Sequence, residues 1–292
     1  MNGDTAMTTA LVALGRLRMT PARILTLVIG VPLVLGLIGW TGFGVIADLG
    51  QASFSVSNTV PVDHGQLVAN VASGNVTVRP VAGTTAHLAA NVQYTLIRPA
   101  VTESTTASGT TIGLNCHMQI DNCALDATLS VPYNTAVTLS SRGGDIAIAG
   151  TVGNVSLSSD GGNVTVSGVG GNASVSTGGG DLTASTLAGQ LRFDTEGGNV
   201  NADTLTAPYL QAESGGGDVS LVFTKPPGYL DITSDGGNVN VVLPPGATTY
   251  RVSTTPDGGN VTGGVPTSNS ASDTITIASG GGDISISITG AS

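Results

Sequence analysis

The sequence predicts an all-β fold: a parallel β-solenoid (β-helix) of 9-residue half-coils and about 18-residue coils, preceded by one transmembrane α-helix. Three observations carry this prediction. The triplet Gly-Gly-Asp/Asn recurs about every 18 residues from Ser140 onward, and short segments that alternate apolar and polar residues follow each copy. Residues 24–47 form a long apolar run without a charge. A regular repeat is a stronger sign of architecture than any single motif.

The composition excludes several classes of protein. The chain has 292 residues with 43 glycines, 9 Lys+Arg against 19 Asp+Glu, and a net charge of −10. Nucleic-acid binding requires clustered positive charge, so no nucleic-acid partner is expected. The glycines lack the Gly-X-Y period of collagen. A hydrophobic fraction of 40% is too high for a chain that is disordered throughout.

The N-terminal part predicts a membrane anchor. Residues 1–23 carry Arg16, Arg18 and Arg23 and are expected to form a cytoplasmic tail. As a helix, residues 24–47 would extend about 36 Å, enough to cross the hydrocarbon core. We therefore expect a single-pass protein of the cell membrane, with its N-terminus cytoplasmic and its C-terminal domain extracytoplasmic. The alternative is a signal peptide cleaved after Ala47, although secretory apolar regions are usually shorter.

The next two segments are expected to link the anchor to the repeat. Residues 48–57 predict a spacer, and residues 58–140 predict an irregular β region that caps the N-terminal end of the solenoid. The two cysteines, Cys116 and Cys123, flank a short loop between apolar segments. In an oxidising compartment a disulfide that closes this hairpin is expected. Free thiols are the next alternative, and a metal site that uses His117 and Asp121 fits zinc spacings poorly.

Residues 141–292 form the repetitive solenoid. The polar residue of each Gly-Gly-Asp/Asn triplet recurs at steps of 18, 18, 18, 19, 20, 22 and 23 residues. In a solenoid these side chains stack as a structural turn ladder, in which Asn between Asp residues would separate like charges. The alternative is that Asp and Asn are interchangeable turn residues. The ladder consists of Asp145, Asn163, Asp181, Asn199, Asp218, Asn238, Asn260 and Asp283.

Each triplet precedes an apolar–polar–apolar segment, which predicts a short strand with one buried face. Such a strand buries its apolar face only when successive coils stack into parallel sheets around a narrow core. The polar residues at the strand centres would then form one exposed face. This candidate binding face consists of Thr165, Thr183, Asn201, Ser220, Asn240 and Ser285. The alternative is that these residues are merely solvated.

No catalytic residue, metal site or cofactor is predicted. The Gly-Gly turns resemble calcium-binding β-roll nonapeptides, but calcium needs six to eight oxygen ligands and many turns here carry Asn. Asp194 with Glu196, or Asp160 near Asp145 or Asp181, could make one weak site. Polysaccharide-cleaving β-helices need paired carboxylates in a cleft, whereas these acids lie on short turns.

From about Phe54 to the C-terminus, the sequence resembles the bacterial putative-adhesin family of unknown function. The resemblance rests on Leu129-Ser130-Val131-Pro132 and on the segment SSRGGDIAIAGTVGNVSLSSDGGNVTVSG that follows. It implies a membrane-anchored solenoid of short β-strand repeats, exposed on the cell envelope. No catalytic residues come with this resemblance.

Three functions follow as hypotheses. The first is a non-enzymatic adhesin or envelope-polymer-binding surface protein, with an envelope polymer, a surface glycan or a membrane protein as partner. The second is an envelope-stress sensor or regulator that acts through a membrane partner. The third, more remote, is an enzyme that acts on envelope polysaccharide.

Overall fold

The computed structural model describes residues 52–62, 65–71, 73–95, 98–106, 109–115, 123–150, 153–246 and 248–290. These residues form 23 β-strands in two sheets. The strands are β1 (Ala52–Pro61), β2 (Gln66–Val71), β3 (Gly74–Val81), β4 (Thr85–Tyr94), β5 (Ala100–Thr106), β6 (Gly109–Asn115), β7 (Ala124–Pro132), β8 (Ala136–Ser141), β9 (Ile146–Ala149), β10 (Val155–Ser159), β11 (Val164–Ser167), β12 (Ala173–Thr177), β13 (Leu182–Ser185), β14 (Gln190–Thr195), β15 (Val200–Leu205), β16 (Tyr209–Ser214), β17 (Val219–Phe223), β18 (Tyr229–Ser234), β19 (Val239–Leu243), β20 (Arg251–Pro256), β21 (Val261–Gly263), β22 (Thr274–Ser279) and β23 (Ile284–Ile288).

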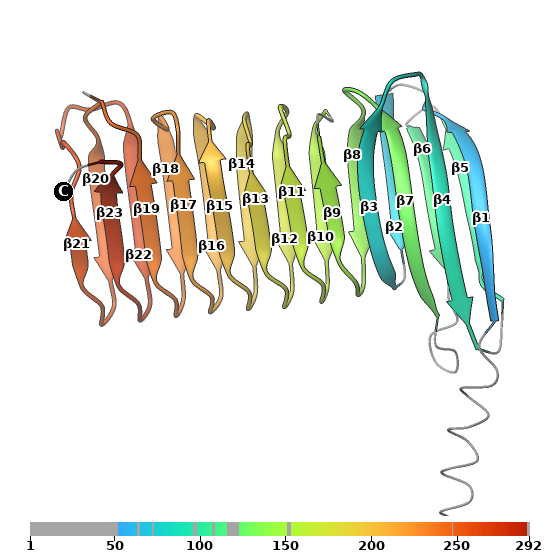
Figure 1. Cartoon of the computed structure of the whole chain (residues 1–292). Helices are drawn as coiled ribbons and strands as arrows, with labels where there is room; N and C mark the ends of the chain where they lie inside the picture. The colour runs from blue at the N-terminus through green and yellow to red at the C-terminus, as the bar shows by residue number, and fades with distance from the viewer. Residues whose placement is uncertain are drawn as a thin grey trace, which may run out of the picture. The chain divides into compact units, whose positions relative to one another are not determined.

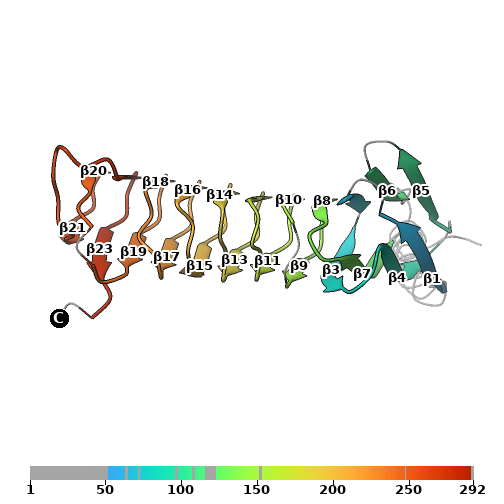
Figure 2. The ribbon, with the colours of Figure 1, turned by 90° about the horizontal axis from the view of Figure 1, so that it is seen from above.

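From β7 onward, successive strands alternate between the two sheets. Sheet A has 12 strands in the order β1-β4-β7-β3-β9-β11-β13-β15-β17-β19-β23-β21. Sheet B has 11 strands in the order β20-β22-β18-β16-β14-β12-β10-β8-β2-β6-β5. Each coil contributes one strand to each sheet, and the coils stand side by side in a row (Figure 1). Figure 2 shows the two sheets as two layers along this row. The predicted parallel solenoid is therefore confirmed.

The core lies between the two sheets and follows from the alternation along each strand. Along β10 buried and exposed residues alternate: Val155 and Leu157 are buried, and Ser156 and Ser158 are exposed. Val155 is in register with Val137 on one side and Ala173 on the other, so apolar side chains stack from coil to coil. The core is thin but also holds aromatic side chains, since Phe193 and Phe223 are fully buried.

The N-terminal region differs from the expected spacer. Residues 52–57 belong to the ten-residue strand β1, which pairs antiparallel with β4, so they are not a spacer. β4 and β7 also pair antiparallel, as do β5 and β6. These antiparallel strands close the N-terminal end of the parallel stack.

The expected cysteine hairpin is wrong. β6 pairs with β2 and β5 in sheet B, whereas β7 pairs with β3 and β4 in sheet A. β6 and β7 therefore belong to different sheets and do not pair with each other as a hairpin. Cys123 is buried just before β7, and Cys116 lies outside the described residues.

The remaining expectations for the N-terminus also lie outside the described residues: the tail 1–23, the span 24–47 and the start of the spacer. Within the part of the chain that the structure describes, no helix is long and apolar enough to cross a membrane.

The order of the last coils is a third correction. Coils in a solenoid are expected to stack in chain order, but β23 lies between β19 and β21, and β22 lies between β18 and β20 (Figure 1). Along the chain, β20 and β21 come before β22 and β23, but they lie at the end of the row. β22 and β23 lie beside β18 and β19.

Candidate functional site

The predicted binding face forms one column on the outside of sheet A. Thr165 is in register with Thr183, and Thr183 with Asn201. The register continues from Asn201 through Ser220 and Asn240 to Ser285, one residue per coil. All six side chains are exposed or half-buried, and none is charged. We call this set the sheet A column: Thr165, Thr183, Asn201, Ser220, Asn240 and Ser285.

The turn ladder is a continuous chain of hydrogen bonds at one edge of sheet A. In each step a backbone N–H donates to the side-chain Oδ1 of the preceding coil, for example Asn163 N to Asp145 Oδ1 (2.8 Å) and Asp181 N to Asn163 Oδ1 (2.9 Å). Asp and Asn can both accept this bond, because both carry an Oδ1 acceptor. The Asn side chains add a second bond, as where Asn199 Nδ2 donates to Asp181 Oδ1 (3.1 Å).

In space the ladder alternates without a break. Asn238 and Asn260 are successive members of the ladder in chain order, but in space Asp283 lies between them. Asp283 N donates to Asn238 Oδ1 (2.9 Å), and Asn260 N donates to Asp283 Oδ1 (2.8 Å). The ladder also extends beyond Asp145, whose N–H donates to Asn75 Oδ1. The spatial order is Asp126, Asn75, Asp145, Asn163, Asp181, Asn199, Asp218, Asn238, Asp283 and Asn260.

The glycine before each ladder residue is required by the distance between coils. A Cβ on Gly180 would overlap the backbone carbonyl oxygen of Gly162 in the neighbouring coil, and one on Gly217 would overlap that of Gly198. The glycine one position earlier is different, because a Cβ on Gly179 would meet no atom within 4 Å. The backbones of neighbouring coils therefore touch at this position of the turn.

A second ladder, of buried hydroxyl groups, was missed by the sequence reasoning. Ser234 Oγ accepts from Gly237 N (2.9 Å) and donates to the Gly217 carbonyl of the neighbouring coil (3.2 Å). Each member precedes its turn by three residues, so the pattern Ser/Thr-x-x-Gly-Asp/Asn was available in the sequence. Among the described residues, every buried side-chain N or O atom has a hydrogen-bond partner. The members are Ser141, Ser159, Thr177, Thr195, Ser214, Ser234 and Ser279, each 1–3% exposed.

The position that follows each residue of the buried hydroxyl ladder carries an acidic side chain in alternate turns. Asp160, Glu196 and Asp235 occupy it in turns whose ladder residue is Asn. In the intervening turns a side chain would clash with the coil before it, and the residue is Gly178, Gly215 or Gly280. Carboxylates at this position are therefore two coils apart, about 10 Å at the usual strand spacing. That distance is close to the Debye length in physiological salt, so their repulsion is small.

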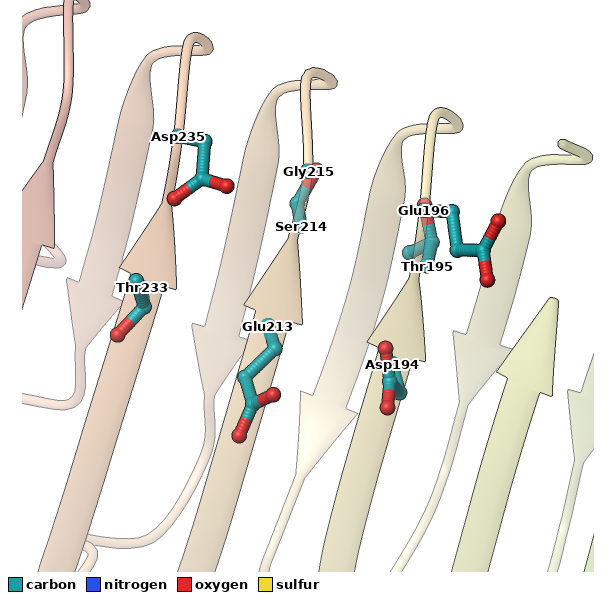
Figure 3. A pocket seen from close by; sticks show the side chains of 8 residues that line it. All are labelled: Asp194, Thr195, Glu196, Glu213, Ser214, Gly215, Thr233 and Asp235. Atoms are coloured by element: carbon teal, nitrogen blue, oxygen red, sulfur yellow. The ribbon is translucent and has the colours of Figure 1, made fainter. Parts of the chain in front are cut away.

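Several charged side chains of sheet B gather on β14, β16 and β18. Asp194 is in register with Glu213, and Glu213 with Thr233. Together with Glu196 and Asp235, which lie nearer the turns, they surround a shallow hollow of about 380 Å³ (Figure 3). We call it the acidic hollow. In the described part of the chain, no three His, Cys, Asp or Glu side chains are placed to hold a metal ion.

A pair of stacked tyrosines lies on the same face. The Tyr209 and Tyr229 rings are parallel within 5°, with centroids 4.6 Å apart. The Tyr229 hydroxyl donates to Asp231 Oδ2 (3.3 Å). Burial, and then the negative charge of Asp231, raise the pKa of Tyr229 above its usual value. Tyr229 therefore remains an uncharged phenol at neutral pH.

Comparison with solved structures finds three bacterial proteins that resemble this chain. Its fold is similar to that of a putative cell adhesion protein from Clostridium sporogenes ATCC 15579, at 11% identity and a TM-score of 0.25, covering 81% of this chain and 100% of the other. It is also similar to putative adhesins from Bacteroides fragilis NCTC 9343 (12% identity, TM-score 0.43) and Parabacteroides distasonis ATCC 8503 (11% identity, TM-score 0.35). Each of these two similarities covers 80% of this chain and 97% of the other.

No curated protein matches the chain. The family described as Toastrack DUF4097 matches residues 101–287, which include β6–β22 and most of β23. The match covers more than half of the sequence and includes the repeated Gly-Gly-Asp/Asn turns described above. The chain belongs to the Toastrack DUF4097 family.

Proposed function

We propose that this protein is a non-enzymatic, adhesin-like surface protein that binds an extended envelope polymer or surface glycan along the sheet A column. The observation that carries the proposal is the column itself: uncharged hydroxyl and amide groups in register over successive coils, at one strand spacing per residue. An extended polymer with repeating hydroxyl or amide groups could form hydrogen bonds at many of these positions, and weak contacts in series give useful affinity.

The proposed setting is the outer side of the cell membrane. Residues 1–23 would be cytoplasmic, residues 24–47 would span the membrane, and the strands would lie outside it. Mass spectrometry of the mature N-terminus tests this arrangement. A mature protein that begins at Asp48 would contradict the anchor and favour secretion.

We also propose a disulfide between Cys116 and Cys123, in keeping with an oxidising compartment. Mass spectrometry of the alkylated, unreduced protein should show both cysteines protected from the reagent. Alkylation of both thiols in protein isolated from the envelope would contradict the disulfide.

The binding role is tested with the full-length chain, purified in a mild detergent. Sedimentation with insoluble envelope polymers should show binding that falls at least about tenfold in the double variant Thr183→Glu, Asn201→Glu. These two residues are in register, so the variant places adjacent charges in the column.

The matched control is Ser140→Glu, Ser158→Glu, another in-register exposed pair that lies on sheet B between the uncharged neighbours Asn70 and Ser176. It introduces the same repulsion without touching the column, so it should bind like the native chain. Equal loss in both variants would contradict a role for the sheet A column. Absence of binding to any polymer would favour the envelope-stress regulator.

A further inference from the structure

The outer face of sheet B contains an abrupt step in side-chain size. Along one column, Gln190 is in register with Tyr209, and Tyr209 with Tyr229. On the other side of Gln190 the side chains are short: Asn172 Oδ1 accepts from Gln190 N, and Asn154 Oδ1 accepts from Asn172 N. The change from small to large residues leaves space in front of Tyr209.

This space is a hollow of about 340 Å³, which we call the amide hollow. Its volume lies within the range of about 300–1,000 Å³ that is typical of small-molecule sites. Among the residues that line it, none carries a carboxylate, in contrast to the acidic hollow nearby. The lining residues are Asn154, Val155, Asn172, Ala173, Ser174, Gln190, Leu191, Arg192, Tyr209 and Gln211.

The Tyr209 ring forms one wall of the amide hollow. Tyr229 covers one face of this ring at 4.6 Å. The rings stack along the row of coils and Gln190 is the register partner on the other side, so the second ring face is directed toward the hollow. Stacking on Tyr229 and the hydroxyl contact with Gln211 Oε1 (3.5 Å) hold the ring in this orientation before any ligand arrives.

The polar groups of the lining favour an uncharged ligand with many hydroxyl groups. The Oδ1 atoms of Asn154 and Asn172 are occupied by backbone N–H groups, which orients both amides and leaves each Nδ2 as a donor. Arg192 donates to Gln211 Oε1 (3.0 Å) and forms an ion pair with Glu213 (3.2 Å). Its charge is therefore already partnered, which disfavours a phosphate or sulfate ligand.

We propose that the amide hollow binds a pyranose unit of a neutral oligosaccharide, with a C–H face of the sugar on the Tyr209 ring. Sugar C–H groups carry small positive partial charges, and the face of an aromatic ring is negative. The hydroxyl groups at the edge of the sugar would meet the amides of Asn154, Asn172 and Gln190. The inference extends the proposed binding role to the opposite sheet, and its test is independent of the sheet A column.

The test uses the full-length chain in detergent with two short neutral probes, chitopentaose and cellopentaose. Saturation-transfer NMR should show transfer from tyrosine protons to sugar C–H protons for at least one probe. Calorimetry should give a dissociation constant of about 1 mM or tighter.

Two variants remove the site in different ways. Tyr209→Ala deletes the aromatic wall, and Ser174→Trp fills the hollow from an exposed position without removing another lining group. Both should weaken binding at least about tenfold. Tyr133→Ala is the matched control, because Tyr133 is an exposed tyrosine (54%) outside the hollow. It should leave binding unchanged.

Failure of both probes to bind would overturn the inference, as would binding that survives both Tyr209→Ala and Ser174→Trp. The double variant Thr183→Glu, Asn201→Glu separates the two proposals. If it abolishes polymer binding while neither short probe binds, the sheet A column stands and the amide hollow does not. If the short probes bind through Tyr209 and the double variant leaves polymer binding unchanged, the amide hollow stands and the sheet A column does not.

Discussion

The coils from β8 to β19 and the coil at the C-terminal end are built from the same repeat, but they are ordered differently. From β8 to β19 each coil stacks on the one before it in the chain. At the C-terminal end, β20 and β21 form the outermost coil, and β22 and β23 are inserted inside it. Chain order alone would bring Asn238 next to Asn260, whereas the observed order places Asp283 between them.

The difference shows that the position of a coil in the row agrees with the Asp–Asn alternation of the turn ladder, and not only with the length of the repeat. An Asn beside an Asp can donate from Nδ2, as Asn260 does to Asp283 Oδ1 (3.4 Å) and Asn238 does to Asp218 Oδ1 (3.1 Å). Two adjacent Asp residues would lack this donor and would repel each other. The observed order gives every Asp of the ladder only Asn neighbours.

The outermost coil also has a contact of its own. Tyr250 is 3% exposed and lies before β20. Its N–H donates to the Pro266 carbonyl (2.9 Å), and its own carbonyl accepts from Ser268 N (3.0 Å). In addition to the pairing of its strands, the last coil is therefore held by a buried tyrosine and by backbone hydrogen bonds to the loop that follows β21.

The largest effect is expected where two regular coils touch through backbone. Gly180→Ala should destabilise the protein by at least about 3 kcal/mol, because its Cβ would overlap the Gly162 carbonyl. Gly179→Ala in the same turn should change stability by less than about 0.5 kcal/mol, since the position is open. Urea unfolding of both variants measures the difference. Similar losses would show that the contact between coils is not the reason for this glycine.

The next effect concerns the outermost coil and pH. Burial, and then the charge of Asp273, raise the pKa of Tyr250 to about 12, above the usual value of about 10. The neutral phenol therefore contributes its full stability below about pH 10, and this contribution, roughly 2–3 kcal/mol, is lost as the pH rises from about 10 to about 12.

Tyr250→Phe keeps the ring and removes the ionising group, so its stability should fall less than that of the native chain over the same pH range. Thermal unfolding at several pH values measures the difference between the two proteins. Parallel pH profiles would show that Tyr250 does not titrate as a buried group in the last coil.

A smaller effect is expected for the buried hydroxyl ladder of the regular coils. Ser234→Ala would leave Gly237 N, inside the turn, without its acceptor and should cost about 1–2 kcal/mol. Ser234→Thr should be close to neutral, because Thr177 and Thr195 hold the equivalent position in other coils. Chemical denaturation of the two variants checks this order. If Ser234→Ala is as stable as the native chain, water replaces the hydroxyl.

The smallest effect for each substitution is expected in the turn ladder. Changing Asn163, Asn199 and Asn238 to Asp would give an unbroken run of carboxylates and remove the Nδ2 donors to Asp181 and Asp218. The loss should be about 0.5 kcal/mol for each substitution at low salt, and salt should reduce it. Melting temperatures at two salt concentrations measure both effects.

The reverse variant, with Asp145, Asp181 and Asp218 changed to Asn, is the control. It keeps every Oδ1 acceptor and lowers the charge, so its melting temperature should equal or exceed that of the native chain. If both triple variants melt like the native protein at low salt, Asp and Asn are interchangeable in these turns.

The sequence by itself determined the repeated features of this protein. The steps of about 18 residues and the alternation around Thr165 and Thr183 predicted parallel coils, the turn ladder and the sheet A column. These features are local, because the alternation sets which side chains are buried and glycine sets where the chain turns.

Only the tertiary structure decided the partners of the irregular segments. The sequence of residues 109–115 and 124–132 predicts two strands that pair as neighbours, yet β6 and β7 belong to different sheets. The position of Asp283 between Asn238 and Asn260 and the amide hollow before Tyr209 likewise depend on which strands lie side by side. The physical reason is that strand pairing and side-chain size across coils join residues far apart in the chain, which no single repeat encodes.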